Sequence, residues 1–145
     1  MGKHLYYKIC LKPLSPFLIG SGQEQSSDID IVRDSLGGPY IPGTSLAGVL
    51  RSLCDNPVEL FGNVTINTSP TDDMKESAIH SKVYVYDGLL PYEETASVDI
   101  RDSVALDEWK TAQGKAKFDF EICNTSLAFT SYLEVNKNNY SASGI

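Results

Sequence analysis

The chain has 145 residues, of which 41% are hydrophobic and 21% are charged, a composition typical of one soluble domain with a hydrophobic core. Its net charge of −7 excludes the overall basic surface that usually marks a nucleic-acid-binding protein. Residues 1–53 carry five lysine and arginine residues against four acidic ones, whereas residues 54–145 carry seven against fifteen. Any contact with nucleic acid must therefore be local or shared with neighbouring subunits.

No stretch approaches the roughly 20 apolar residues of a membrane span, and the first residues lack the apolar core of a secretory signal. The cysteines Cys10, Cys54 and Cys123 are widely spaced and odd in number, which fits neither a zinc site nor a disulfide framework. We therefore expect reduced, mostly packed thiols, a cytoplasmic location and no membrane partner.

Alternating apolar and polar residues predict a half-buried strand over residues 4–12, HLYYKICLK. A short apolar run then ends in a Gly-Ser-Gly turn, and the polar, acidic stretch 23–30 predicts a loop. Residues 62–80 have the composition of a flexible surface loop. Further alternating segments predict strands at residues 81–88, 116–122 and 126–135. Strands around one helix indicate an α+β protein with an antiparallel sheet.

That helix is predicted in the segment GGPYIPGTSLAGVLRSL, residues 37–53, after a turn rich in glycine and proline. Its apolar positions follow the i, i+3, i+4, i+7 spacing of one helix face. They are Leu46, Val49, Leu50 and Leu53. Thr44 or Ser45 is expected to cap the helix through its hydroxyl group.

A family resemblance rests on three segments: FLIGSG at 17–22, DIDIVRDSLGGPYIPGTSLAGVLRSL at 28–53 and IRDSVALDEWKTAQGKAKFDFEI at 100–122. The second is similar to the signature of the RAMP superfamily, in which an Asp and an Arg-Asp pair precede Gly-x-Pro-Tyr-Ile-Pro-Gly-Ser-Ser-Leu-Lys-Gly-x-Leu-Arg. The first resembles that family's opening strand and glycine loop, and the third its protruding β-hairpin, often called the thumb. The chain most resembles the backbone subunit of type III CRISPR effector complexes, which act in antiviral defence.

The resemblance implies a ferredoxin-like, RNA-recognition-motif-like core, with a helix packed on an antiparallel sheet and an inserted hairpin arm over residues 91–117. Such subunits grip the backbone of a guide RNA and leave its bases to pair with target RNA. The expected partners are therefore guide RNA, target RNA and other effector subunits. Residues 1–145 are expected to form a single domain that lacks the family's C-terminal part. Ala47 stands where the family signature has a lysine.

The start of the predicted helix has two open interpretations. In one, Thr44 or Ser45 caps the helix and Gly43 only permits the turn. In the other, Gly43, Thr44 and Ser45 offer N–H and hydroxyl donors to an RNA phosphate, and the helix dipole favours that contact. The resemblance favours the second interpretation, with Arg51 as a further contact and Gly48 allowing close approach.

Two other regions contain candidate RNA contacts. Arg33 could contact the guide or form a salt bridge with Asp30 or Asp34. In the hairpin arm, the resemblance implies contacts from Arg101 and Lys115 where the arm enters between guide and target. A surface hairpin without an RNA role is the alternative. Outward aromatic residues, here Tyr84 and Tyr86, can stack on bases, but packing against the arm explains them equally well.

Asp28 is the candidate catalytic residue, because the resemblance aligns it with a loop aspartate that cuts target RNA with a divalent metal. Asp30 is the alternative at this position. A carboxylate there could hold Mg²⁺ or orient an attacking 2′-hydroxyl. The function implied is a guide-RNA-binding subunit and metal-dependent endoribonuclease. The alternative is a non-catalytic adaptor that contacts protein neighbours, which the acidic second part of the chain favours.

Overall fold

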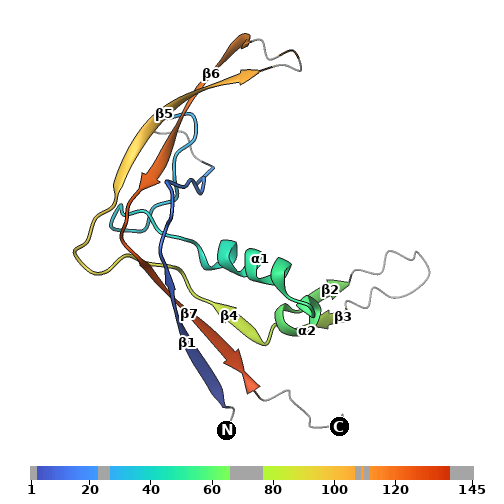
Figure 1. The fold of residues 1–145 in the computed structure, drawn as a ribbon. Helices are drawn as coiled ribbons and strands as arrows, with labels where there is room; N and C mark the ends of the chain where they lie inside the picture. Colours follow the sequence, from blue (N-terminus) through green and yellow to red (C-terminus); the bar gives the residue numbers. More distant parts are fainter. Residues whose placement is uncertain (1–2, 23–26, 66–76, 107–108, 110–111, 138–145) are drawn as a thin grey trace. The chain divides into compact units, whose positions relative to one another are not determined.

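The computed structural model describes residues 3–22, 27–65, 77–106, 109 and 112–137. Its helices and strands, labelled in Figure 1, confirm the α+β class. In chain order they are β1 (His4–Leu11), α1 (Gly43–Leu53), α2 (Pro57–Phe61), β2 (Asn63–Thr65), β3 (Ser77–Ile79), β4 (Val83–Val85), β5 (Ser97–Leu106), β6 (Ala112–Asn124) and β7 (Phe129–Asn136). Neither described helix is long and apolar enough to cross a membrane.

The strands form one three-stranded sheet in the order β1–β7–β4 and two two-stranded ribbons, β2–β3 and β5–β6. By their internal contacts the residues divide into two compact units. The first unit comprises residues 1–9, 42–87 and 131–145, and the second comprises residues 10–41 and 88–130. The single domain expected over residues 1–145 therefore stays a prediction.

Strand alternation places the side chains of β4 and β7 as the sequence predicts. In the antiparallel register of the two strands, Val85 lies opposite Leu133 and Tyr84 lies opposite Glu134. Val83 is buried, whereas Tyr84 and Tyr86 are about half exposed. The expected outward position of both tyrosines is therefore confirmed.

The start of α1 differs from the prediction. Pro42 is the N-cap, and no side chain makes a capping hydrogen bond, so the expected cap by Thr44 or Ser45 is wrong. The carbonyl of Pro42 accepts the N–H groups of Ser45 and Leu46, which places both hydroxyl residues inside the first helical turn. The carboxylate of Asp87, from a later segment, binds this end of the helix instead: it accepts the N–H of Gly43 at 2.7 Å.

Residues 62–80, expected as a loop throughout, form the β2–β3 ribbon at their two ends, where Asn63 pairs with Ile79 and Thr65 with Ser77. Residues 66–76 lie outside the described part, so the flexibility expected there stays a prediction. Gly62 ends α2 with φ = 76°, a conformation that favours glycine. The carbonyl of Gly62 accepts a 2.9 Å hydrogen bond from Arg51 of α1, which fixes the corner between the two helices.

The core of the second unit consists of Ile31, Cys123 and Phe129, each at most 4% exposed. Phe17 packs edge-to-face on Phe129, with ring centroids 5.7 Å apart. All three cysteines are free; Cys123 is packed as expected, but Cys10 is exposed. The mostly packed thiols expected from the sequence are thus only partly found.

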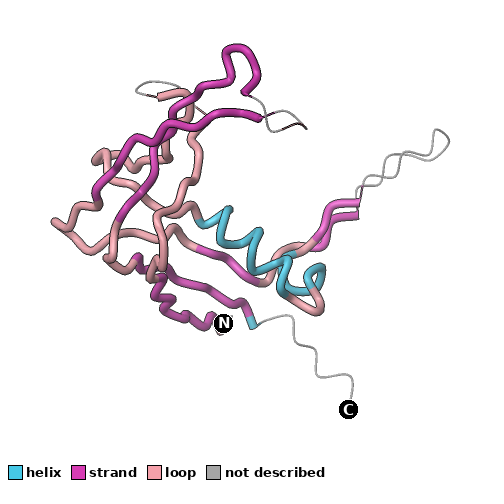
Figure 2. The backbone as a smooth tube through the Cα atoms, turned by 45° about the horizontal axis from the view of Figure 1, so that its top comes forward, coloured by secondary structure: helices cyan, strands magenta, loops and turns pink. Residues whose placement is uncertain are grey.

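The hairpin arm both begins and ends later in the chain than predicted. β5 and β6 run side by side as one antiparallel ribbon (Figure 2), paired from Ser97 opposite Asn124 to Leu106 opposite Ala112. β6 continues without a break from Ala112 into the core residue Cys123. The second half of the predicted arm, 91–117, and the predicted strand, 116–122, are therefore one strand. Local alternation could not reveal this continuity.

The contrast between two glycines of α1 gives a stability prediction. A Cβ atom on Gly43 would overlap the carbonyl oxygen of Val85, whereas a Cβ on Gly48 would meet nothing within 4 Å. We expect Gly43→Ala to lower the free energy of unfolding by about 1–3 kcal/mol, and Gly48→Ala to raise it by about 0.5–1 kcal/mol. Urea unfolding of both variants measures this, and equal effects would contradict the close approach of α1 to β4.

Candidate nucleic-acid interface

Residues 27–33, which carry the candidate aspartates, lie along β6 within the second unit. Ile29 and Phe120 form a parallel bridge, and the N–H of Glu121 donates to the carbonyl of Ile29 at 2.9 Å. The loop is therefore bonded to the hairpin by its backbone.

Glu121 strengthens this attachment through its side chain, which is buried. One carboxylate oxygen accepts the N–H of Ile31 at 3.0 Å, and the other accepts Nη2 of Arg33 at 2.9 Å. One of the two expectations for Arg33 was a salt bridge with Asp30 or Asp34. The structure instead pairs Arg33 with Glu121. The reason is the register with β6, which brings together residues 88 positions apart.

The two aspartates that flank Arg33 in the sequence serve the local backbone. Asp30 is 6% exposed, and its Oδ1 accepts hydrogen bonds from the N–H and the hydroxyl of Ser27. Asp34 accepts the N–H groups of Leu36 and Gly38 and so closes the glycine turn. This geometry gives Asp30 a structural part in the loop, which makes Asp28 the better placed of the two catalytic candidates.

Asp28 is exposed and is joined to Asp119 of β6 by two reciprocal hydrogen bonds. The N–H of Asp28 donates to Oδ1 of Asp119 at 2.8 Å, and the N–H of Asp119 donates to Oδ2 of Asp28 at 2.9 Å. Each carboxylate is thereby fixed on the backbone of the other residue. Asp119 was not predicted from the sequence, because only the parallel register of residues 27–33 on β6 makes it a neighbour of Asp28.

The donor set suits Mg²⁺ only in part. The carboxylates of Asp28 and Asp119 each use one oxygen to accept the backbone N–H of the other residue. Mg²⁺ is commonly held by one or two carboxylates together with water and substrate phosphate. Among the described residues no group of three or more His, Cys, Asp or Glu side chains could hold a metal. An ion here would therefore rely on bound RNA for its remaining ligands.

The helix start in the first unit offers fewer donors than expected. The Gly43 N–H is already bonded to Asp87, whose carboxylate stands where a phosphate would sit. Thr44 and Ser45 are exposed, and Gly48 is exposed beside open space. Phosphate binding at this position stays a prediction, and it would fall mainly to the two exposed hydroxyl residues.

The predicted cationic contacts are distributed over both units. Arg51 donates to Gly62 in the first unit, whereas Arg33 is paired in the second. Arg101 is exposed on β5, opposite Phe120. Lys115 belongs to β6, but its side chain lies outside the described part. Arg101 is thus the predicted contact that the structure exposes most clearly.

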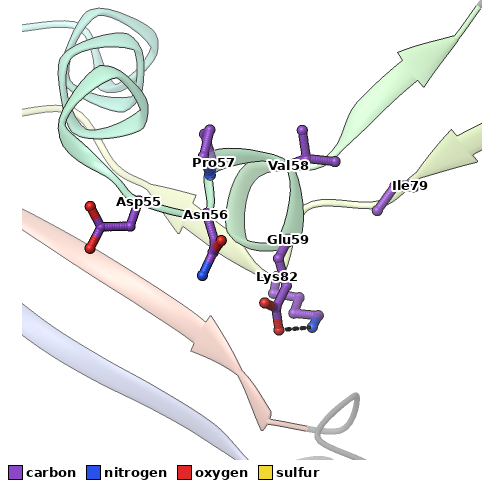
Figure 3. A pocket seen from close by; sticks show the side chains of 7 residues that line it. All are labelled: Asp55, Asn56, Pro57, Val58, Glu59, Ile79 and Lys82. Atoms are coloured by element: carbon purple, nitrogen blue, oxygen red, sulfur yellow. Dashed lines mark hydrogen bonds and ion pairs between the residues drawn. The ribbon is translucent and has the colours of Figure 1, made fainter.

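A hollow of about 490 Å³ beside α2 is a separate candidate in the first unit. Glu59 and Lys82 point toward one another there and form a 3.2 Å ion pair (Figure 3). Asp55 is the remaining charged residue of its lining. An acidic hollow whose lysine is paired does not suit a phosphate group.

A cluster of polar side chains around Glu134, on the sheet of the first unit, was not predicted from the sequence. Glu134 accepts a 2.6 Å hydrogen bond from the hydroxyl of Tyr86 and lies 2.6 Å from Nδ1 of His4. The bond from Tyr86 lowers the pKa of Glu134, and His4 and Tyr6 lower it further. The same bond raises the pKa of Tyr86, because a carboxylate stabilises the neutral phenol.

The RAMP superfamily model matches residues 10–142 of the sequence. The chain belongs to the RAMP superfamily. The resemblance predicted from the three sequence segments is thereby confirmed.

A curated relative of this RAMP protein is the CRISPR system Cms protein Csm5 of Enterococcus italicus, 33% identical over 88 residues. The match covers 54% of this chain and 25% of Csm5, so the chain spans about a quarter of that relative's length. Two solved Type III-B Cmr-beta structures contain similar chains, one in the apo state (TM-score 0.62) and one bound to cognate target RNA (TM-score 0.68). Both are 11% identical and match 93% of this chain and 85% of their own, which shows a shared fold.

The Glu134–Tyr86 bond predicts a linked titration. The raised pKa means that Tyr86 stays neutral to a higher pH than free tyrosine, so this bond stabilises the fold below the unfolded-state pKa and is lost as pH rises through the folded value. The lowered pKa of Glu134 means that its carboxylate stabilises the fold above the unfolded-state pKa, and that this stabilisation is lost as pH falls through the folded value. We expect Glu134→Gln to return the pKa of Tyr86 toward that of free tyrosine in an NMR titration. An unchanged Tyr86 titration would contradict the bond.

Proposed function

We propose that this RAMP protein works in the cytoplasm as an RNA-contacting component of a type III CRISPR effector complex, with guide RNA, target RNA and other effector subunits as its partners. The observation that carries the proposal is the fold shared over 93% of the chain with Type III-B Cmr-beta chains, one of them from a complex bound to cognate target RNA. The curated relative Csm5 supports the same assignment.

The contact with RNA is local, since a chain of net charge −7 repels phosphate as a whole. We assign it to the exposed Arg101 on the hairpin and to the exposed Thr44 and Ser45 at the start of α1. Arg33 and Arg51 contribute less, because each already donates hydrogen bonds within the protein. Contacts of this kind read the RNA backbone and leave the bases available for pairing.

The second part of the proposal is that the chain cleaves target RNA. Asp28 and Asp119 are the residues that would hold Mg²⁺, which would supply Lewis-acid stabilisation of a phosphate undergoing displacement. The reciprocal hydrogen bonds fix both carboxylates before RNA arrives, and such preorganisation favours catalysis.

A second candidate function is the non-catalytic adaptor. A specific observation favours it: Asp87 occupies the helix-start N–H of Gly43, while Arg33 and Arg51 donate to protein carboxylate and carbonyl groups. An adaptor would use these contacts only to stabilise its own fold.

RNA binding at two salt concentrations distinguishes the two functions. We expect the chain to bind single-stranded guide RNA in fluorescence anisotropy, and Arg101→Gln to reduce the salt dependence (log K against log salt) by about 0.7, the value of one lost phosphate contact. Lys12→Gln, which removes an exposed lysine outside the proposed contact, is the matched control. Failure of the unmodified chain to bind at low salt would favour the adaptor.

Cleavage requires its own experiment, with the chain bound to guide RNA and complementary target RNA in Mg²⁺. We expect Asp28→Asn to slow target cleavage by about 100-fold or more while leaving RNA affinity unchanged, because the loss would affect chemistry and not binding. Asp55→Asn removes an exposed carboxylate in the first unit and serves as the control. Absence of cleavage by the RNA-bound unmodified chain would contradict the catalytic assignment.

A further inference from the structure

The first unit presents an aromatic face on its sheet, which we call the tyrosine face. It consists of Tyr6 on β1, Tyr84 and Tyr86 at and just after β4, Tyr132 on β7, and the carboxylate of Glu134 between them. The four tyrosines are 46–62% exposed. Alternation turns the apolar side chains of the same strands to the other face, where Val83 is buried. The rings are therefore not needed to fill the core.

The carboxylate of Glu134 is held in place within this face. Tyr86 donates to one oxygen and His4 lies against the other, each at 2.6 Å, and the side chain is 13% exposed. Tyr6, on the same face of the sheet, also lowers the pKa of this carboxylate. Tyr84 lies directly opposite Glu134 in the strand register, and a hollow of about 350 Å³ is lined by these two residues together with Val85 and Tyr86. Tyrosine side chains and a negative charge thus meet at one shallow depression.

This combination of groups is specific for a cation. Tyrosine rings attract a guanidinium group through their electron-rich faces, and a carboxylate accepts its N–H groups. Arginine fits better than lysine, since its planar group stacks on a ring while donating at its edge. RNA fits less well: bases can stack on tyrosine, but the flanking phosphates would be repelled by the carboxylate of Glu134.

We propose that the tyrosine face is a docking surface for a protein partner that inserts an arginine side chain between the rings and Glu134. The proposal is independent of RNA binding and cleavage, which are assigned to other residues. Charge complementarity identifies the occupant: a fixed carboxylate among exposed tyrosine side chains selects a cationic side chain. Aromatic residues and arginine are also the residues enriched where protein interfaces are strongest.

An NMR titration of the intact chain with the peptide acetyl-Gly-Arg-Gly-Arg-Gly-amide tests this surface. We expect the peptide to shift the resonances of Tyr84, Tyr86 and Glu134. Glu134→Gln and Tyr84→Leu should each weaken binding about tenfold, the loss expected when one charged or cation–π contact is removed. Tyr92→Leu, which removes an 88% exposed tyrosine in the second unit, should leave it unchanged.

Three further probes make the result decisive. The same peptide with citrulline in place of arginine keeps the shape but lacks the charge, and it should bind at least about tenfold more weakly. Equal binding of the citrulline peptide, or no effect of either face variant, would overturn the proposal. Stronger shifts of the same residues by an eight-nucleotide oligouridylate would assign the face to RNA. If the peptide bound only to a chain that ends at Lys137, the face would be assigned to residues 138–145 as its occupant and the proposal would be overturned.

Discussion

The buried carboxylate of Glu121 is the interaction on which the second unit depends. A carboxylate removed from water is stable only when its oxygens are hydrogen-bonded, and here Ile31 and Arg33 supply those bonds. Both belong to the loop that carries Asp28, so satisfying the buried charge also fixes the loop on β6. Ile31 enters the core beside Cys123 through the same attachment. The position of an exposed candidate residue thus depends on a buried one.

This dependence explains which parts of the molecule could be predicted from the sequence. Alternation along one strand is a local signal, and it identified the outward Tyr84 and Tyr86 and the strand that contains the buried Phe129 and Ser131. The amphipathic spacing likewise identified α1. Its cap was mispredicted because the acceptor is Asp87, 44 residues away, and no local pattern reports such a contact.

The candidate site shows the same division. The motif around Asp28 and Arg33 was visible in the sequence, but their partners Asp119 and Glu121 come from β6 and appear there as ordinary residues of an alternating strand. A parallel register between a loop and a distant strand decides which side chains meet. Family resemblance could align Asp28, yet only the fold shows a second carboxylate beside it. Glu134 was missed because its partners, His4 and Tyr86, lie on two other segments.

The chain uses many of its polar groups internally, and this has a consequence for assembly. Arg33, Arg51 and the N–H of Gly43 all bond within the protein, while the net charge remains −7. An acidic component can join an RNA-containing complex only if cations offset its repulsion from the phosphates. Arginine side chains of a partner, docked near Glu134, would offset part of this chain's negative charge and so reduce that repulsion. Under the proposed function the roles would be divided: neighbouring subunits would neutralise most of the RNA charge, and this chain would add a few local contacts.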